Sequence, residues 1–173
     1  MKEDSLEISK YIQLAKKNQK EGRLKQANEI YKNLINKKIY TYELLISYGL
    51  FNKEINNLIV AKNLFTLAIK KYPLLIKSYI LLAEIFRIQN NFNNAYEILM
   101  NAKKVEKDNA DVDYNLSILF KTNKLYKEAI IHINNALNNS PKIDLYKILK
   151  ADILIDNFQN PEAEKVLGNL ILD

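Results

Sequence analysis

The chain has 173 residues, of which 48% are hydrophobic and 27% are charged, and it contains no cysteine. This composition excludes a chain that is disordered throughout, a disulfide framework and a thiolate metal site. The formal net charge of +6 arises in the first half, because residues 1–75 carry 14 Lys or Arg against 7 Asp or Glu, whereas residues 76–173 carry 12 against 13. Such an excess favours an anionic partner, although lysines on the solvated backs of helices give the same pattern.

The predicted elements, in chain order, are five helical hairpins, each with a helix, a short turn and a second helix. They span residues 8–41, 42–75, 76–109, 110–143 and 144–173. The turns are predicted at Gly22; Asn56 and Asn57; Asn90 and Asn91; Asn123; and Asn157, Asn160 and Pro161. Asparagine suits these places because it tolerates the left-handed conformation that ends a helix and caps the next helix. The three Gly and three Pro residues of the chain are too few for a many-turned β-sandwich, so an all-α fold is predicted.

Alanine and other small side chains recur every 34 residues in three columns, the third of which has leucine at its two ends. The first column holds Ala15, Gly49, Ala83, Ser117 and Ala151; the second holds Ala27, Ala61, Ala95, Ala129 and Ala163; the third holds Leu34, Ala68, Ala102, Ala136 and Leu170. Eleven of the twelve alanines lie in these columns, and only Ala110 does not. Because the distance between packed helices depends on the side chains at their crossing, alanine there lets two backbones come close. The columns therefore predict stripes of helix–helix contact.

This repeat resembles the tetratricopeptide repeat family. The third unit matches the family pattern best, through Tyr79, Leu82, Ala83, Phe86, Ala95, Leu99 and Ala102. The first and last units depart from the pattern, since Asn18 replaces an aromatic residue and Lys147 and Lys150 replace apolar ones. Such departures are expected at the ends of a repeat array. The resemblance implies a right-handed α-α superhelix of about ten antiparallel helices, which forms one domain over residues 1–173.

Catalysis is poorly supported by the residues. We interpret the single histidine, His132, as a packing or surface residue, and no second His or Cys is available to build a metal site. The acidic stretch from Glu106 to Asp113 lacks the glycine and the distal glutamate of a calcium loop, so we interpret it as a solvated turn. No glycine-rich phosphate loop is present. We therefore expect a protein that is not an enzyme and that needs no cofactor or metal.

The resemblance implies a different working surface, a groove lined by the first helices of successive units. The residues expected to line it are Ile12, Lys16, Ile46, Leu50, Lys53, Ile80, Leu81, Glu84, Arg87, Tyr114, Asn115, Ile118 and Lys121. We expect a peptide or an amphipathic helix of a partner protein to place apolar side chains on the apolar members of this set. Acidic groups of the partner would then meet Lys53, Arg87 and Lys121. An alternative is that one stripe of this surface, the isoleucine stripe, mainly packs first helix against first helix. Its members are Ile12, Ile46, Ile80, Tyr114 and Ile148.

Two other functions stay open at this stage. A basic solenoid that binds RNA or DNA is disfavoured, because most aromatic residues occupy core registers instead of a stacking face. A targeting module of a longer enzyme is the other alternative. The last unit ends on Leu170, Ile171 and Leu172, and a bare apolar edge there predicts self-association through the C-terminal hairpin.

The start of the chain has no apolar core of the kind found in secretory signals. No apolar run approaches the roughly 18 residues that a membrane span needs. We therefore expect a cytoplasmic location and no membrane insertion.

Overall fold

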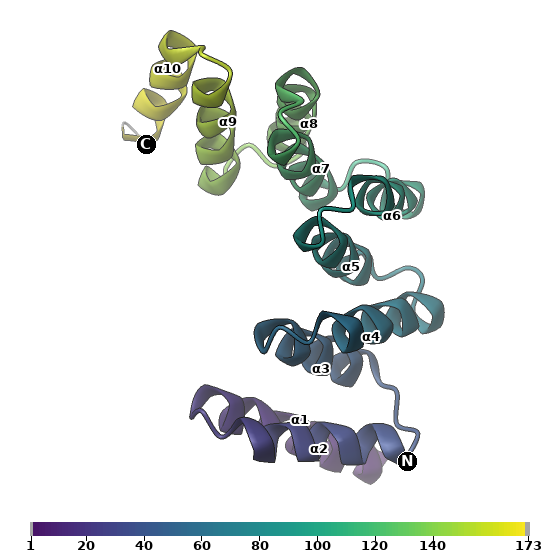
Figure 1. The fold of residues 1–173 in the computed structure, drawn as a ribbon. Coiled ribbons are helices and arrows are strands. Elements are labelled where there is room, and N and C mark those ends of the chain that lie inside the picture. The colour runs from purple at the N-terminus through teal and green to yellow at the C-terminus, as the bar shows by residue number, and fades with distance from the viewer. Residues whose placement is uncertain (1, 172–173) are drawn as a thin grey trace. The chain divides into compact units, whose positions relative to one another are not determined.

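The computed structural model describes the backbone of residues 2–171 and the side chains of residues 6–168. Over this range the chain forms ten α-helices and no strand (Figure 1). The helices are α1 (Lys2–Lys20), α2 (Leu24–Asn36), α3 (Tyr42–Glu54), α4 (Leu58–Lys71), α5 (Ile76–Ile88), α6 (Phe92–Val105), α7 (Ala110–Thr122), α8 (Tyr126–Asn139), α9 (Asp144–Asp156) and α10 (Asn160–Ile171). The prediction of an all-α fold is confirmed. None of the described helices is both long and apolar enough to cross a bilayer.

The helix starts follow the repeat of the sequence. Helices α3, α5, α7 and α9 begin at residues 42, 76, 110 and 144, and α2, α4, α6, α8 and α10 begin at residues 24, 58, 92, 126 and 160. Both series therefore advance by 34 residues. Side-chain caps support some of these starts, because Thr41 Oγ1 accepts from the backbone N–H of Leu44, and Asn109 Oδ1 accepts from that of Val112.

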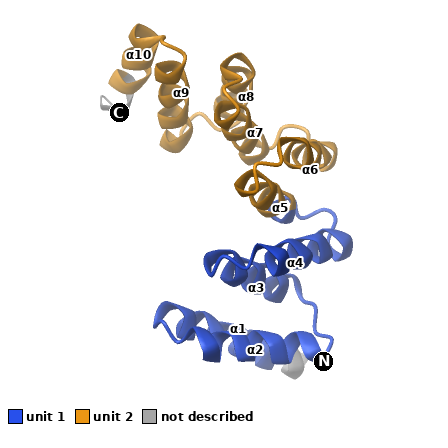
Figure 2. Ribbon diagram, viewed as in Figure 1, with its two compact units in different colours: residues 1–78 blue, residues 79–173 orange. Residues whose placement is uncertain are grey.

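The helices gather into two compact units, residues 1–78 and residues 79–173 (Figure 2). In the first unit α1 packs on α2, α3 packs on α4, and α3 also contacts α1 and α2. In the second unit α6 packs on α7, α7 on α8, α8 on α9, and α9 on α10. Both units are thus built by stacking neighbouring helices, and the single domain expected from the sequence stays a prediction.

The columns of small residues lie at the buried contacts between helices. Every member of the second column, from Ala27 to Ala163, has an exposed fraction of 2% or less. Members of the first column are also buried, as are Leu34, Ala68, Ala102 and Ala136 of the third, whereas the side chain of Leu170 lies outside the described residues. The prediction that small side chains mark helix contacts is therefore confirmed for the described members.

Each hairpin turns through one residue in the left-handed conformation. These residues are Gly22, Asn56, Asn90, Lys124 and Phe158, again 34 apart. In the second hairpin the Asn56 N–H donates to the Lys53 carbonyl (3.0 Å) and the Asn57 N–H donates to the Asn52 carbonyl (2.7 Å). The same pair of bonds recurs in the other four turns. This is the Schellman arrangement that satisfies the last carbonyls of a helix.

The turn residues assigned from the sequence in the last two hairpins were one position early. Asn123 and Asn157 are the C-cap residues of α7 and α9, and the left-handed residues are Lys124 and Phe158, which follow them. The Asn123 Nδ2 group donates to the Leu119 carbonyl (2.8 Å) and its backbone N–H donates to the Phe120 carbonyl (3.1 Å), so this asparagine satisfies the end of α7 without adopting the left-handed conformation. Phe158 is 91% exposed, so burial of its ring contributes little to offset the energetic cost of its positive φ.

We predict that Phe158→Gly stabilises the second unit by about 1 kcal/mol, because glycine adopts a positive φ without the steric penalty of a side chain. Urea unfolding followed by circular dichroism measures the change. The matched control is Phe158→Ala, which also removes the exposed ring but keeps a Cβ, and it should gain much less. Equal gains from both variants would show that the ring, and not the backbone conformation, is unfavourable.

We also predict opposite effects of alanine at two helical glycines. A Cβ at Gly49 would overlap the ring of the buried Phe65, whereas a Cβ at Gly168 meets nothing within 4 Å. Gly49→Ala should therefore destabilise the protein by about 1–3 kcal/mol through overpacking. Gly168→Ala should stabilise it by about 0.5–1 kcal/mol through helix propensity. Thermal unfolding of both variants tests this, and a stabilised Gly49→Ala protein would contradict the packing described here.

Candidate functional site

A pocket of about 460 Å³ opens on the first unit. Helix α1 contributes Lys16 and Gln19, α2 contributes Tyr31, and the first turn of α5 contributes Lys77. The remaining lining residues come from α3, and they are Tyr42, Glu43, Ile46, Ser47 and Leu50. The pocket thus joins an apolar wall on α3 to a polar rim on α1 and α5. Lys16, Ile46 and Leu50 were all expected from the sequence to share one surface.

The charge around this pocket is predominantly positive. Glu43 is its only acidic lining residue, and its Oε1 atom already accepts from Lys16 Nζ (2.9 Å) and Gln13 Nε2 (3.0 Å). A second hollow of about 370 Å³ shares Lys16 and Gln19 with the pocket and adds Gln13, Lys17 and Lys20, with no acidic residue in its lining. Glu54, which is outside both linings, accepts from Gln19 Nε2. The lining cations Lys16, Lys17, Lys20 and Lys77 still outnumber Glu43 and Glu54, so an anionic group is favoured over a cationic one at this end of the unit.

Tyr31 of α2 is a polar residue whose side chain is fully buried. Its ring stacks on Tyr48 with a centroid distance of 5.0 Å and lies 5.7 Å from the ring of Phe51. Burial, assisted by the negative charge of Glu43, raises the pKa of Tyr31 to about 12, so the hydroxyl keeps its proton at neutral pH. Among the described residues this hydroxyl has no hydrogen-bond partner. Most buried polar groups have one, so this atom needs an explanation.

The first helices of the second unit carry other residues of the predicted groove. Tyr114, Asn115 and Ile118 of α7 are half-buried, and the ring of Tyr114 stacks on Tyr146 of α9 at 5.0 Å. Glu84, Arg87 and Asn115 come together around a cavity of only about 10 Å³, which is room for no more than one water molecule. Among the cavities described, none in this unit is comparable to the pocket of the first unit.

Lys121, which the sequence assigned to an acidic partner, is paired within the chain. Its Nζ atom lies 2.9 Å from the Asp152 Oδ2 atom and 2.9 Å from the Asp156 Oδ2 atom. Burial alone would lower the pKa of Lys121, but these two carboxylates raise it overall, so the ammonium stays charged. A partner would have to compete with both aspartates for this cation. Lys16 is paired in a similar way with Glu43.

Comparison with solved structures identifies the fold. A tetratricopeptide repeat protein from Parabacteroides merdae superposes with a TM-score of 0.82 at 15% identity, over 96% of this chain and 65% of that one. A thermophilic TPR protein from Thermus thermophilus gives 0.76 at 13% identity, over 94% and 89% of the two chains. The chain has the tetratricopeptide-repeat (TPR) fold. MamA from Desulfovibrio magneticus is also similar, with a TM-score of 0.74 at 13% identity over 95% of this chain and 93% of that one. No protein-family model matches the sequence, and no curated protein is detectably similar to it.

The residues predicted to line a groove differ in how much of their side chains is exposed. Ile12, Ile46 and Leu81 are 0%, 8% and 7% exposed, so they mainly pack against neighbouring residues. Of the other members of the isoleucine stripe, Ile80 and Tyr114 are half-buried and Ile148 is 51% exposed, so the alternative interpretation of this stripe stays a prediction. The other members of the predicted groove are half-buried, and they are Lys16, Leu50, Lys53, Ile80, Glu84, Arg87, Tyr114, Asn115, Ile118 and Lys121. The apolar edge at Leu170, Ile171 and Leu172 lies outside the described side chains, so self-association stays a prediction.

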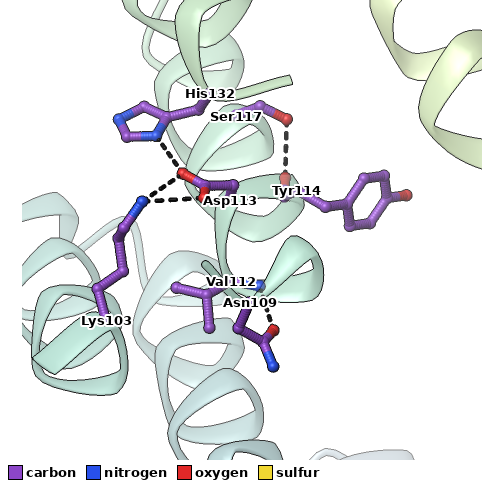
Figure 3. Close-up of polar contacts among 7 residues, drawn as sticks. All are labelled: Lys103, Asn109, Val112, Asp113, Tyr114, Ser117 and His132. Atoms are coloured by element: carbon purple, nitrogen blue, oxygen red, sulfur yellow. Dashed lines mark hydrogen bonds and ion pairs between the residues drawn. The ribbon is translucent and has the colours of Figure 1, made fainter. Parts of the chain in front are cut away.

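A buried polar cluster in the second TPR unit was missed by the sequence analysis (Figure 3). The carboxylate of Asp113 on α7 is 1% exposed, and it accepts from Lys103 Nζ of α6 at 2.8 and 2.9 Å. His132 Nδ1 of α8 lies 2.8 Å from Asp113 Oδ1, and the ring of His132 stacks on Phe120. Asp113 had been interpreted as part of a solvated turn, which is wrong. Across the described residues no group of three His, Cys, Asp or Glu side chains is placed to hold a metal ion.

The repeat register contains the signal that would have found this cluster. Two repeats earlier, the positions of Lys103, Asp113 and His132 hold Ile35, Leu45 and Leu64. Three charged or titratable residues thus replace three apolar ones in adjacent helices. Lys103 and His132 both contact the Asp113 carboxylate, so the buried charge has partners. Burial alone would raise the pKa of Asp113, but hydrogen bonds from His132 and Lys103 and the charges of both residues lower it.

We predict that Asp113→Asn destabilises the protein by about 3 kcal/mol at pH 7, because it leaves the half-buried Lys103 ammonium without its counter-charge. Urea unfolding measures this, with the exposed Asp108→Asn as a control that should change stability by less than about 0.5 kcal/mol. The pKa of Asp113 is lower in the folded chain, so the contribution is complete above the ordinary aspartate value of about 3.9 and is lost as the pH falls through the lowered value. A difference that persists unchanged at still lower pH would contradict this assignment.

A triple variant separates charge compensation from packing. Lys103→Ile, Asp113→Leu and His132→Leu together copy the residues of the earlier repeat. The variant should be at least as stable as the natural chain, because apolar groups of similar size often replace a buried ion cluster without loss. A triple variant that is as unstable as Asp113→Asn would show that the cluster has a role beyond mutual compensation.

Proposed function

We propose that the chain is a non-enzymatic interaction scaffold that binds a peptide or an amphipathic helix of a partner protein on the first helices of its repeats. The observation that carries this proposal is the pocket of the first unit. Its apolar wall, formed by the half-buried Leu50 with the largely buried Ile46 beside it, lies next to a rim that carries Lys16 and Lys77. A peptide can bind such a site by packing apolar side chains on the apolar wall, while its polar side chains contact the charged rim and fix its orientation.

The second unit presents half-buried apolar residues on α7, without a cavity comparable to the pocket of the first unit among those described. Tyr114 and Ile118 are half-buried there, so each presents an apolar edge to solvent. The similarity to TPR proteins of known structure supports an interaction role but does not name a partner. The polar clusters at Asp113 and at Lys121 are ion pairs between helices and stabilise the packing of the repeats.

The proposal predicts that peptide binding depends on Leu50 and Ile118. Short peptides with blocked ends are selected by display on the purified chain, and the affinity of the enriched sequences is measured by calorimetry. Leu50→Glu together with Ile118→Glu should weaken these peptides by about tenfold or more, because each substitution places a charge where an apolar anchor would be buried.

The matched control is Ile59→Glu together with Ile131→Glu. These two residues are 69% and 58% exposed and lie on the second helices α4 and α8, so the control introduces the same charges in the same units on other helices. It should bind the peptides like the natural chain. Circular dichroism confirms that both double variants fold. A failure to select any peptide, or an equal loss in both double variants, would contradict the proposed function.

A further inference from the structure

Tyr31 lines the pocket of the first unit, and its buried hydroxyl has no hydrogen-bond partner among the described residues. Its ring forms a three-membered aromatic cluster with Tyr48 and Phe51, with centroid distances of 5.0, 5.7 and 6.2 Å, and the side chain is fully buried in this cluster. A buried donor without an acceptor is unfavourable, and such atoms in native proteins call for a specific explanation. An acceptor that arrives with a ligand would complete this hydrogen bond.

The charges near Tyr31 indicate which acceptor fits. Lys16 and Lys77 are the two cations that line the pocket, and the exposed ammonium of Lys77 lies at its rim. Glu43 is the single acid, and Lys16 and Gln13 already bind it. The adjoining hollow on α1 adds Lys17 and Lys20. This surface attracts an anion and repels a cation, and a carboxylate accepts hydrogen bonds from both a phenol and an ammonium group.

We propose that this pocket receives the side-chain carboxylate of a Glu or Asp in a partner peptide, with Tyr31 as the hydrogen-bond donor at its wall and Lys77 as the counter-charge at its rim. An apolar residue next to that acid packs on Ile46 and Leu50, the apolar part of the same pocket. Further acidic residues of the peptide extend toward Lys17 and Lys20. This inference rests on the proposed function and assigns the chemistry that its main site recognises.

The decisive variant is Tyr31→Phe, which removes one oxygen atom and keeps the ring. The probes are a blocked peptide from the display selection that carries Glu next to an apolar residue, and the same peptide with Gln in place of Glu. The natural chain should bind the Glu peptide more tightly than the Gln peptide. Tyr31→Phe should weaken the Glu peptide by about tenfold, the usual effect of losing a hydrogen bond to a charged group, and should narrow the preference for Glu over Gln.

The thermal midpoint of the free protein gives an independent readout. Since the hydroxyl has no partner in the unliganded chain, Tyr31→Phe should leave the midpoint unchanged or raise it. A clear fall in the midpoint would show that the hydroxyl is already satisfied, and it would overturn the inference. So would a Glu peptide that binds the variant and the natural chain equally.

Lys77→Gln tests the cation at the rim, with Lys70→Gln on α4 as a control of equal charge change in the same unit. Only Lys77→Gln should weaken the Glu peptide and reduce the salt dependence of its binding. If both variants weaken the Glu peptide equally, Lys77 makes no specific contact with the peptide carboxylate, and only long-range attraction by the positive charge of the unit remains. If selected peptides depend on Leu50 and Ile118 but contain no preferred acid, or bind only through a free C-terminal carboxylate, the inference fails while the proposed function stands.

Discussion

Within each unit the helices pack against one another at alanine and other small residues. The spacing of the helices depends on these contacts. Residues such as Ala61 and Ala95 are almost completely buried although they contribute little apolar surface of their own. Their value is geometric, because a small residue lets two helix backbones approach and lets larger neighbours, such as Phe65 and Leu99, fill the space around the crossing. The 34-residue recurrence of these crossings gives the first helices equivalent faces, and the candidate site uses those faces.

Much of the fold was accessible from the sequence because this constraint is local and repeats. A column such as Ala27 to Ala163 is visible without any structure, and so are the turns at Gly22, Asn56 and Asn90. The remaining two turns were misplaced by one residue because asparagine, here Asn123 and Asn157, is the residue type most expected at a left-handed position after glycine. Lys124 and Phe158 take the strained conformation since the geometry of the hairpin requires it at that position, whichever residue is there.

The candidate site was less accessible, for two physical reasons. The depth of a residue in a stacked helix face depends on the neighbouring repeat, and this is why Ile12 is 0% exposed while Ile148, which has the same register in the last repeat, is 51% exposed. Hydrogen-bond partners also depend on three-dimensional placement. Tyr31 follows Ala27 of the second column by one helical turn, which is consistent with burial of its ring, but the sequence has no means of showing that its hydroxyl lacks a partner.

The most direct test of this account compares the free energy of unfolding of Ala95→Leu and Ala110→Leu. Ala95 is 1% exposed in the second column, whereas Ala110 is half-buried at the start of α7 and is the one alanine outside the columns. The account predicts that leucine at residue 95 lowers stability by about 1–3 kcal/mol through overpacking at a helix crossing, and that leucine at residue 110 changes it little. Equal stabilities of the two variants, measured by urea unfolding, would contradict the claim that small side chains at the crossings determine how the repeats pack.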